Sequence, residues 1–134
     1  MDAHELGQIP LFSDLSEDDV DALATYADEV TVSQGKHLVD EGGYAYDLFA
    51  IVEGTAQVIV GGEVVAELGP GDFFGEAGVL GKQQRNATVV AKTRMRLVTL
   101  TGWDLRRMRR QLGPVIDKLE QAIRQRGGNP VPES

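Results

Sequence analysis

The sequence predicts a mainly β domain with flanking helices. We expect an eight-stranded antiparallel β roll, a jelly-roll-like double-stranded β-helix, with an N-terminal helix and two C-terminal helices. Glycine is frequent, at 16 of 134 residues, and falls at regular turn positions. The segments between these turns are short, as in small sandwiches and barrels. Helical periodicity is confined to the two ends of the chain.

The first expected element is a helix over residues 16–28. Ser16 is a good N-cap residue, and the acids at 17–19 suit the positive end of a helix dipole. Apolar residues then recur at helical spacing: Val20, Leu23, Ala24 and Ala27.

Six of the eight expected strands can be placed between the turns, over residues 37–40, 47–52, 55–60, 63–68, 87–92 and 95–100. Two of them alternate between apolar and other residues, which predicts one buried face on each. The members of these faces are Ala56, Val58 and Val60 in one strand and Val64, Ala66 and Leu68 in the other. Gly61-Gly62 between them is typical of a two-residue hairpin loop, because glycine adopts positive φ without strain.

Two helices are expected after the strands. Leu105, Met108 and Leu112 mark the first, and Gly113-Pro114 breaks it. The second runs from about residue 114 to 126. We therefore expect residues 1–128 to form a single domain and residues 129–134 to be a flexible tail or the stump of a linker.

Composition excludes several function classes. The chain has no cysteine and only two histidines, so thiolate zinc sites, cysteine nucleophiles and most histidine metal sites are excluded. No apolar run is long enough to span a membrane, and the first residues lack a signal-peptide pattern. A cytoplasmic, non-catalytic domain without metal or cofactor is expected. The alternative of a cupin-like metalloenzyme lacks its ligand set of clustered His and Glu on facing strands, because His4 lies in the N-terminal segment and His37 is alone on a strand.

Charge is distributed unevenly along the chain, whose net charge is −8. Residues 1–35 hold nine acids and no Lys or Arg, whereas residues 82–126 hold twelve of the thirteen basic residues. This pattern fits two solvated faces of opposite sign, or an anionic ligand bound by the second half.

The segment between residues 71 and 88 interrupts the strand pattern. A short helix beginning near Glu76 would point free backbone N–H groups at a ligand, and small residues at Gly75, Ala77 and Gly78 would let the ligand approach. Arg85 could hold a phosphate in its planar fork. An anion held there could present a hydroxyl to the Glu76 carboxylate, so the segment predicts a sugar-phosphate site.

At these residues the chain resembles the cyclic nucleotide-binding domain family, which includes catabolite activator proteins and protein kinase A regulatory subunits. The matching signature is Phe74-Gly75-Glu76 followed by Arg85-x-Ala87-Thr88, the family's phosphate-binding cassette. The resemblance covers about residues 9–126. It implies a regulatory module in which Glu76 binds the ribose 2′-hydroxyl and Arg85 the phosphate. The backbone N–H groups of Ala77 and Ala87 would complete the phosphate site.

The resemblance leaves the choice of nucleotide open. Asn86 stands where cyclic GMP binders often carry Thr, which favours cyclic AMP, and Gln84 replaces a frequent proline. The implied ligand-contacting set is Phe74, Gly75, Glu76, Ala77, Gly78, Arg85, Asn86, Ala87 and Thr88. The alternatives are a cyclic GMP binder, or a ligand-free roll that serves as an interaction domain.

The last helix carries a narrow apolar seam, formed by Leu112, Ile116, Leu119 and Ile123. The seam could pack on the domain itself. The resemblance adds two readings, in which Ile116, Leu119 or Ile123 covers the base, or the helix pairs two subunits in a weak homodimer. A downstream effector domain is the other expected partner. DNA binding by this chain is not expected, because the residues after Arg126 are too few for a helix-turn-helix domain.

Overall fold

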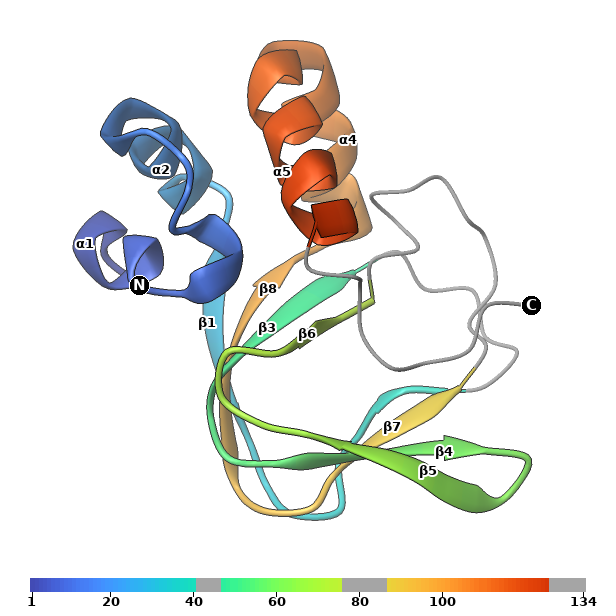
Figure 1. Cartoon of the computed structure of the whole chain (residues 1–134). Coiled ribbons are helices and arrows are strands. Elements are labelled where there is room, and N and C mark those ends of the chain that lie inside the picture. The colour runs from blue at the N-terminus through green and yellow to red at the C-terminus, as the bar shows by residue number, and fades with distance from the viewer. Residues whose placement is uncertain (41–46, 76–86, 126–134) are drawn as a thin grey trace.

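The computed structural model describes residues 1–40, 47–75 and 87–125. Its strands form two four-stranded antiparallel sheets, in the orders β1-β8-β3-β6 and β2-β7-β4-β5 (Figure 1). The strands are β1 (Asp28–Val32), β2 (His37–Val39), β3 (Leu48–Glu53), β4 (Ala56–Val60), β5 (Glu63–Leu68), β6 (Phe73–Phe74), β7 (Thr88–Ala91) and β8 (Met95–Leu100). Helices cover one face of the first sheet, so the expected β roll with flanking helices is confirmed.

The N-terminal helical region differs from the expectation. Ser16 caps α2 (Glu17–Ala24) as predicted, its hydroxyl accepting from the Asp19 N–H at 3.1 Å. The expected end at residue 28 was wrong. The helix ends at Ala24, because the chain must straighten into β1 to pair with β8. Two further elements precede it: α1 (Ala3–Gly7) and the 3-10 turn η1 (Pro10–Phe12).

The two C-terminal helices lie close to their expected places, as α4 (Gly102–Gln111) and α5 (Gly113–Gln125). Leu112 leaves helical geometry between them, with φ −134° and ψ 46°. Within the described residues, no helix has the length and apolar content that crossing a membrane requires.

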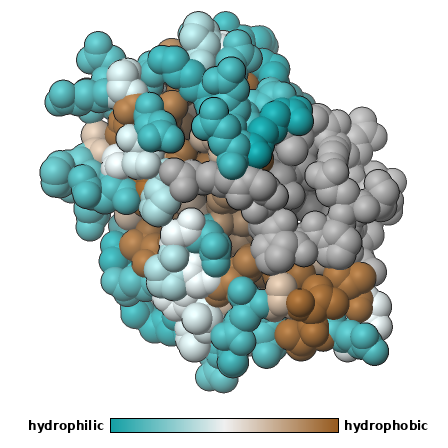
Figure 2. Space-filling view, in the orientation of Figure 1, coloured by the Kyte–Doolittle hydropathy of each residue, from teal (hydrophilic) through white to brown (hydrophobic). Residues whose placement is uncertain are grey.

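The β4–β5 hairpin turns at Gly61-Gly62, whose φ angles of 59° and 83° confirm the predicted loop. The buried face expected on β5 is only partly present. The register shifts between Val58 and Ile59, and Val64 is 55% exposed rather than buried with Leu68. Val65 is exposed too, and Figure 2 shows apolar surface in this part of the molecule.

The inner strands of the first sheet, β3 and β8, are buried on both faces. Ala50 of β3 and Val98 of β8 belong to a core shared with the helices, whereas Ile51 and Leu97 belong to the core between the two sheets. The molecule therefore has three layers, in the order helices, first sheet, second sheet.

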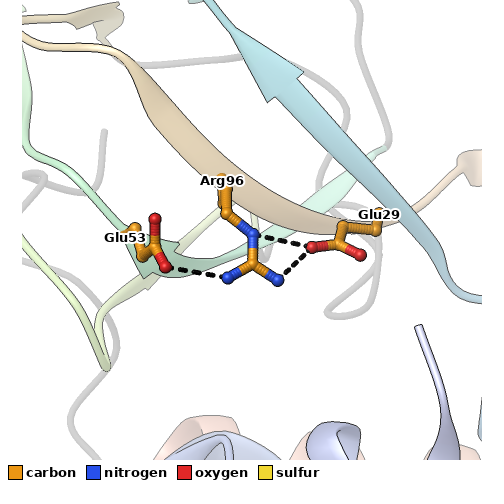
Figure 3. Close-up of polar contacts among 3 residues, drawn as sticks. All are labelled: Glu29, Glu53 and Arg96. Atoms are coloured by element: carbon orange, nitrogen blue, oxygen red, sulfur yellow. Dashed lines mark hydrogen bonds and ion pairs between the residues drawn. The ribbon is translucent and has the colours of Figure 1, made fainter.

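An ion-pair cluster crosses three strands of the first sheet (Figure 3). Arg96 of β8 lies between Glu29 of β1 and Glu53 of β3, with its Nε donating to Glu29 and its Nη1 to Glu53 at 2.8 Å each. These hydrogen bonds, the one to Glu29 first, raise the pKa of the guanidinium above its usual value. The cluster holds β1, whose side chains are mostly exposed, in register with β8.

Candidate ligand-binding site

The described ends of the predicted cassette lie on different sheets. Phe74 ends β6 at the edge of the first sheet, and Gly75 follows it. Ala87 directly precedes β7, an inner strand of the second sheet that Thr88 begins. The segment thus begins at the edge of the first sheet and ends at an inner strand of the second. Glu76, Ala77, Gly78, Arg85 and Asn86 lie outside the described residues.

Phe74 anchors the first end of the cassette. Its side chain is buried and stacks on Phe49 of β3, with ring centroids 4.9 Å apart and an interplanar angle of 17°. The two residues also face each other in the β3–β6 register. Gly75 then turns with φ 83°, a conformation that favours glycine. Packing at Phe74 and the turn at Gly75 together fix the last described residues before Glu76.

The second end is held by the core between the sheets. Ala87 is 3% exposed and belongs to that core, so a larger side chain there would meet packed neighbours. Thr88 pairs with Ile59 in the register of β7 and β4. A strand paired on both sides is a fixed platform for the residues just before it.

One polar contact that sequence reasoning missed ties α4 to the start of β3. Asp47 accepts a hydrogen bond from the Gly102 N–H through its Oδ1, at 2.9 Å. Thr101 and Asp104 form a capping box at the same helix end. The capping box can be predicted from the sequence as a Thr-x-x-Asp pattern. The contact with Asp47 cannot, because it joins residues far apart in the sequence. The start of α4 is thereby tied to the strand that packs against Phe74.

The apolar seam of α5 lies inside the domain's own core. Ile116, Leu119 and Ile123 are each no more than 1% exposed. They share a core with buried residues of the N-terminal helices, Leu6, Leu11, Phe12 and Leu23. In this structure the seam therefore packs on its own domain, which is the first of the three alternatives. In this arrangement none of the three side chains is available to cover a ligand or to pair with a second subunit.

A surface ion pair links the same helices. Lys118 of α5 contacts Asp19 of α2, with 2.6 Å between Nζ and Oδ2. The hydrogen bond from Lys118 lowers the pKa of the Asp19 carboxyl below its usual value. The link is thus charged at neutral pH, and it is lost as acid protonates the carboxyl.

The described residues contain no group of three or more His, Cys, Asp or Glu side chains that could hold a metal. His4 lies in α1, and His37 of β2 pairs with Asp40 at the surface, 2.8 Å apart. The cupin-like alternative therefore gains no support from the described part of the chain.

Comparison with known proteins decides the family. Residues 29–111, more than half of the chain, match the sequence profile of the cyclic nucleotide-binding domain. The chain belongs to the cyclic nucleotide-binding domain family. The matched region contains both sheets from Glu29 onward, the whole cassette and α4.

Curated relatives of this cyclic nucleotide-binding domain include kinase and channel proteins. A cAMP-dependent protein kinase regulatory subunit of Yarrowia lipolytica is 41% identical over 119 residues, which are 87% of this chain and 31% of that protein. A putative potassium channel protein of Rhodopseudomonas palustris is 32% identical over 92% of this chain and 31% of its own length. The domain thus spans about a third of these relatives.

Solved structures agree with this fold. The N-terminal domain of a transcriptional regulator from Streptomyces coelicolor A3(2) superposes with a TM-score of 0.75 at 27% identity, covering 94% of this chain and 92% of that one. The catabolite activator protein of Thermus thermophilus has a TM-score of 0.71 at 30% identity, covering 87% of this chain and 57% of that protein.

Proposed function

We propose that this domain binds a cyclic nucleotide, with cyclic AMP preferred, and that it regulates rather than catalyses. The observation that carries the proposal is the cassette signature, Phe74-Gly75-Glu76 and Arg85-x-Ala87-Thr88, in a chain of this family. Its described ends support the proposal. The buried Phe74 and the positive φ of Gly75 fix one end, and the small, buried Ala87 fixes the other.

The chemistry of the segment suits a cyclic monophosphate, which carries a single negative charge. One guanidinium, from Arg85, and the backbone N–H groups of Ala77 and Ala87 can neutralise it without a metal. The Glu76 carboxylate would accept a hydrogen bond from the ribose 2′-hydroxyl, and the Gly75 carbonyl could share this hydrogen bond. Asn86 in place of Thr favours adenine, and the Yarrowia lipolytica relative is itself named cAMP-dependent.

Calorimetric titration with cyclic AMP and cyclic GMP tests the proposal. Glu76→Gln should weaken the binding of cyclic AMP. The substitution should have little effect on the binding of 2′-deoxy cyclic AMP, because this ligand has no 2′-hydroxyl to donate a hydrogen bond to the carboxylate. Glu63→Gln, on the exposed β5 strand, is the matched control and should bind as the parent does. If cyclic GMP bound more strongly than cyclic AMP, the proposed preference for cyclic AMP would be wrong. Binding of neither nucleotide would make the domain a ligand-free interaction module.

We further propose that binding is signalled through α4 and α5. Phe74 packs on Phe49, β3 begins one residue after Asp47, and Asp47 holds the start of α4. A shift at Phe74 can therefore reach α4 through neighbouring contacts. The buried Ile116, Leu119 and Ile123 would cover the base only if α5 moved from its present position.

Hydrogen exchange measured with and without cyclic AMP tests this route. We expect slower exchange in two regions, the cassette at residues 75–88 and the last helix at residues 114–126. The strands should change little, because non-local pairing already protects them. Protection of the cassette alone, with α5 exchanging at its free rate, would show that the signal leaves by another route.

The proposal places this domain, over residues 1–128, within a regulatory system that includes a downstream effector. Residues 129–134 would then be the tail or the start of a linker. A cytoplasmic location suits this role, because cyclic nucleotides are intracellular messengers.

A further inference from the structure

The outward face of α4 carries an unusual pair of side chains. Trp103 is 70% exposed, although tryptophan is normally buried to a large extent. The guanidinium of Arg106 lies over its ring, 5.1 Å from the ring centroid, within the range of a cation–π contact. Arg110 follows one turn later on the same side of the helix and is exposed. We call Trp103, Arg106 and Arg110 the α4 stripe.

The α4 stripe lies outside the buried core of the domain. The inward face of α4 is supplied by Leu105 and Met108, which are 4% and 0% exposed. Exposed Trp and Arg are the residue types most enriched at the energetic centres of protein interfaces. The Trp103–Arg106 stack also restricts both side chains before any partner binds, which lowers the entropic cost of association.

The charge of the surrounding surface indicates what the α4 stripe would bind. The chain carries a net charge of −8, yet α4 contains four arginines and one acid. The acids are concentrated at the other end of the sequence, where residues 1–35 contain nine of them and no Lys or Arg. Asp18 and Asp21 of α2 are exposed, lie three residues apart and belong to this acidic region. We call Asp18 and Asp21 the α2 acidic face.

Among the described residues, neither surface is neutralised by ion pairs of its own chain. In the part of the chain that the structure describes, Asp19 of α2 pairs with Lys118, but Asp18, Asp21, Arg106 and Arg110 form no ion pair. Both helices lie at the same end of the molecule, on the helical side of the first sheet (Figure 1). One chain therefore presents a basic aromatic surface together with its acidic complement.

We propose that the α4 stripe of one copy of this chain docks on the α2 acidic face of a second copy. This association is independent of the α5 seam, which is buried in the domain's own core. A polyanionic partner, such as DNA or an anionic vesicle, is disfavoured because the nine acids of residues 1–35 would repel it. Because exposed charges are screened by salt, the association should weaken as ionic strength rises.

Charge reversal with complementation tests this proposal by sedimentation over a range of protein concentrations. At low salt the parent should self-associate. Arg106→Glu with Arg110→Glu, and separately Asp18→Lys with Asp21→Lys, should each weaken self-association by at least about tenfold, because each places like charges opposite one another. Mixing the two variants should restore association, since the unchanged arginines of one variant then meet the unchanged aspartates of the other, and the new glutamates meet the new lysines. Trp103→Ala should also weaken association while leaving the thermal midpoint unchanged.

Lys36→Glu with Arg94→Glu is the matched control, since both residues are exposed in turns of the roll and this pair makes the same change in net charge as the arginine variant. It should self-associate as the parent does once salt is matched. A parent that stays monomeric to millimolar concentration would overturn the proposal. So would a mixture of the two reversed variants that fails to associate although each is folded by circular dichroism. Binding of the monomeric parent to duplex DNA or to anionic vesicles, lost in the arginine variant, would assign the α4 stripe to that partner instead.

Discussion

Gly54→Ala should lower the free energy of unfolding by about 3–5 kcal/mol. Gly54 forms the turn between β3 and β4 with φ +89°, a conformation that side chains disfavour. An added Cβ would lie 2.4 Å from the backbone oxygen of Arg94 and 2.9 Å from Met95 Cγ. The Arg94 carbonyl belongs to the turn that enters β8, so it cannot retreat without disturbing an inner strand of the first sheet.

Gly35→Ala is the matched control for this substitution. Gly35 has the same φ of +89°, but an added Cβ would meet no atom within 4 Å. Only the conformational cost remains, about 1–2 kcal/mol. Urea unfolding of both variants separates the two effects. Equal losses would show that the β7–β8 turn relaxes around the new methyl group.

Arg85→Ala should reduce the affinity for cyclic AMP by about 2–4 kcal/mol, or roughly 30- to 900-fold. A phosphate removed from water needs a charged partner, and in a protein of net charge −8 an unpaired anion is especially costly. Calorimetry measures this loss directly. The thermal midpoint without ligand should stay near that of the parent.

Arg94→Ala is the control for the loss of one positive charge, because Arg94 is exposed in a turn. It should bind cyclic AMP within about twofold of the parent, since exposed charges are strongly screened. An Arg85→Ala protein that binds within about threefold of the parent would exclude Arg85 as the phosphate ligand.

The sequence predicted the strands that carry a local signal. The Gly61-Gly62 hairpin and the strand that became β8 were readable from turn residues and β-branched runs. β1 was missed because its only apolar residues are Val30 and Val32, too few for a clear alternation, and most of its side chains are exposed. It is held instead by pairing with β8 and by the Arg96 cluster, which involve residues far along the chain. β6 was missed because two residues are too short for any periodicity.

The candidate site divides in the same way. The cassette is continuous in sequence, so its order of small residues, Glu76 and Arg85 could be recognised without a structure. The contact between Asp47 and Gly102 could not, because it depends on β3 and β8 lying side by side. The α5 seam was readable as apolar, but sequence alone left its partner open. Only the folded arrangement assigns it to the N-terminal helices.

Trp103 is the single tryptophan of the chain and lies at the start of α4 with most of its side chain in water. The intrinsic tryptophan emission of the protein therefore originates from one place, beside the Arg106 guanidinium. Removal of water from that indole shifts its emission to shorter wavelength, while changes among the tyrosines and phenylalanines leave it untouched. The unlabelled protein thus carries its own optical reporter of what happens at the first turn of α4.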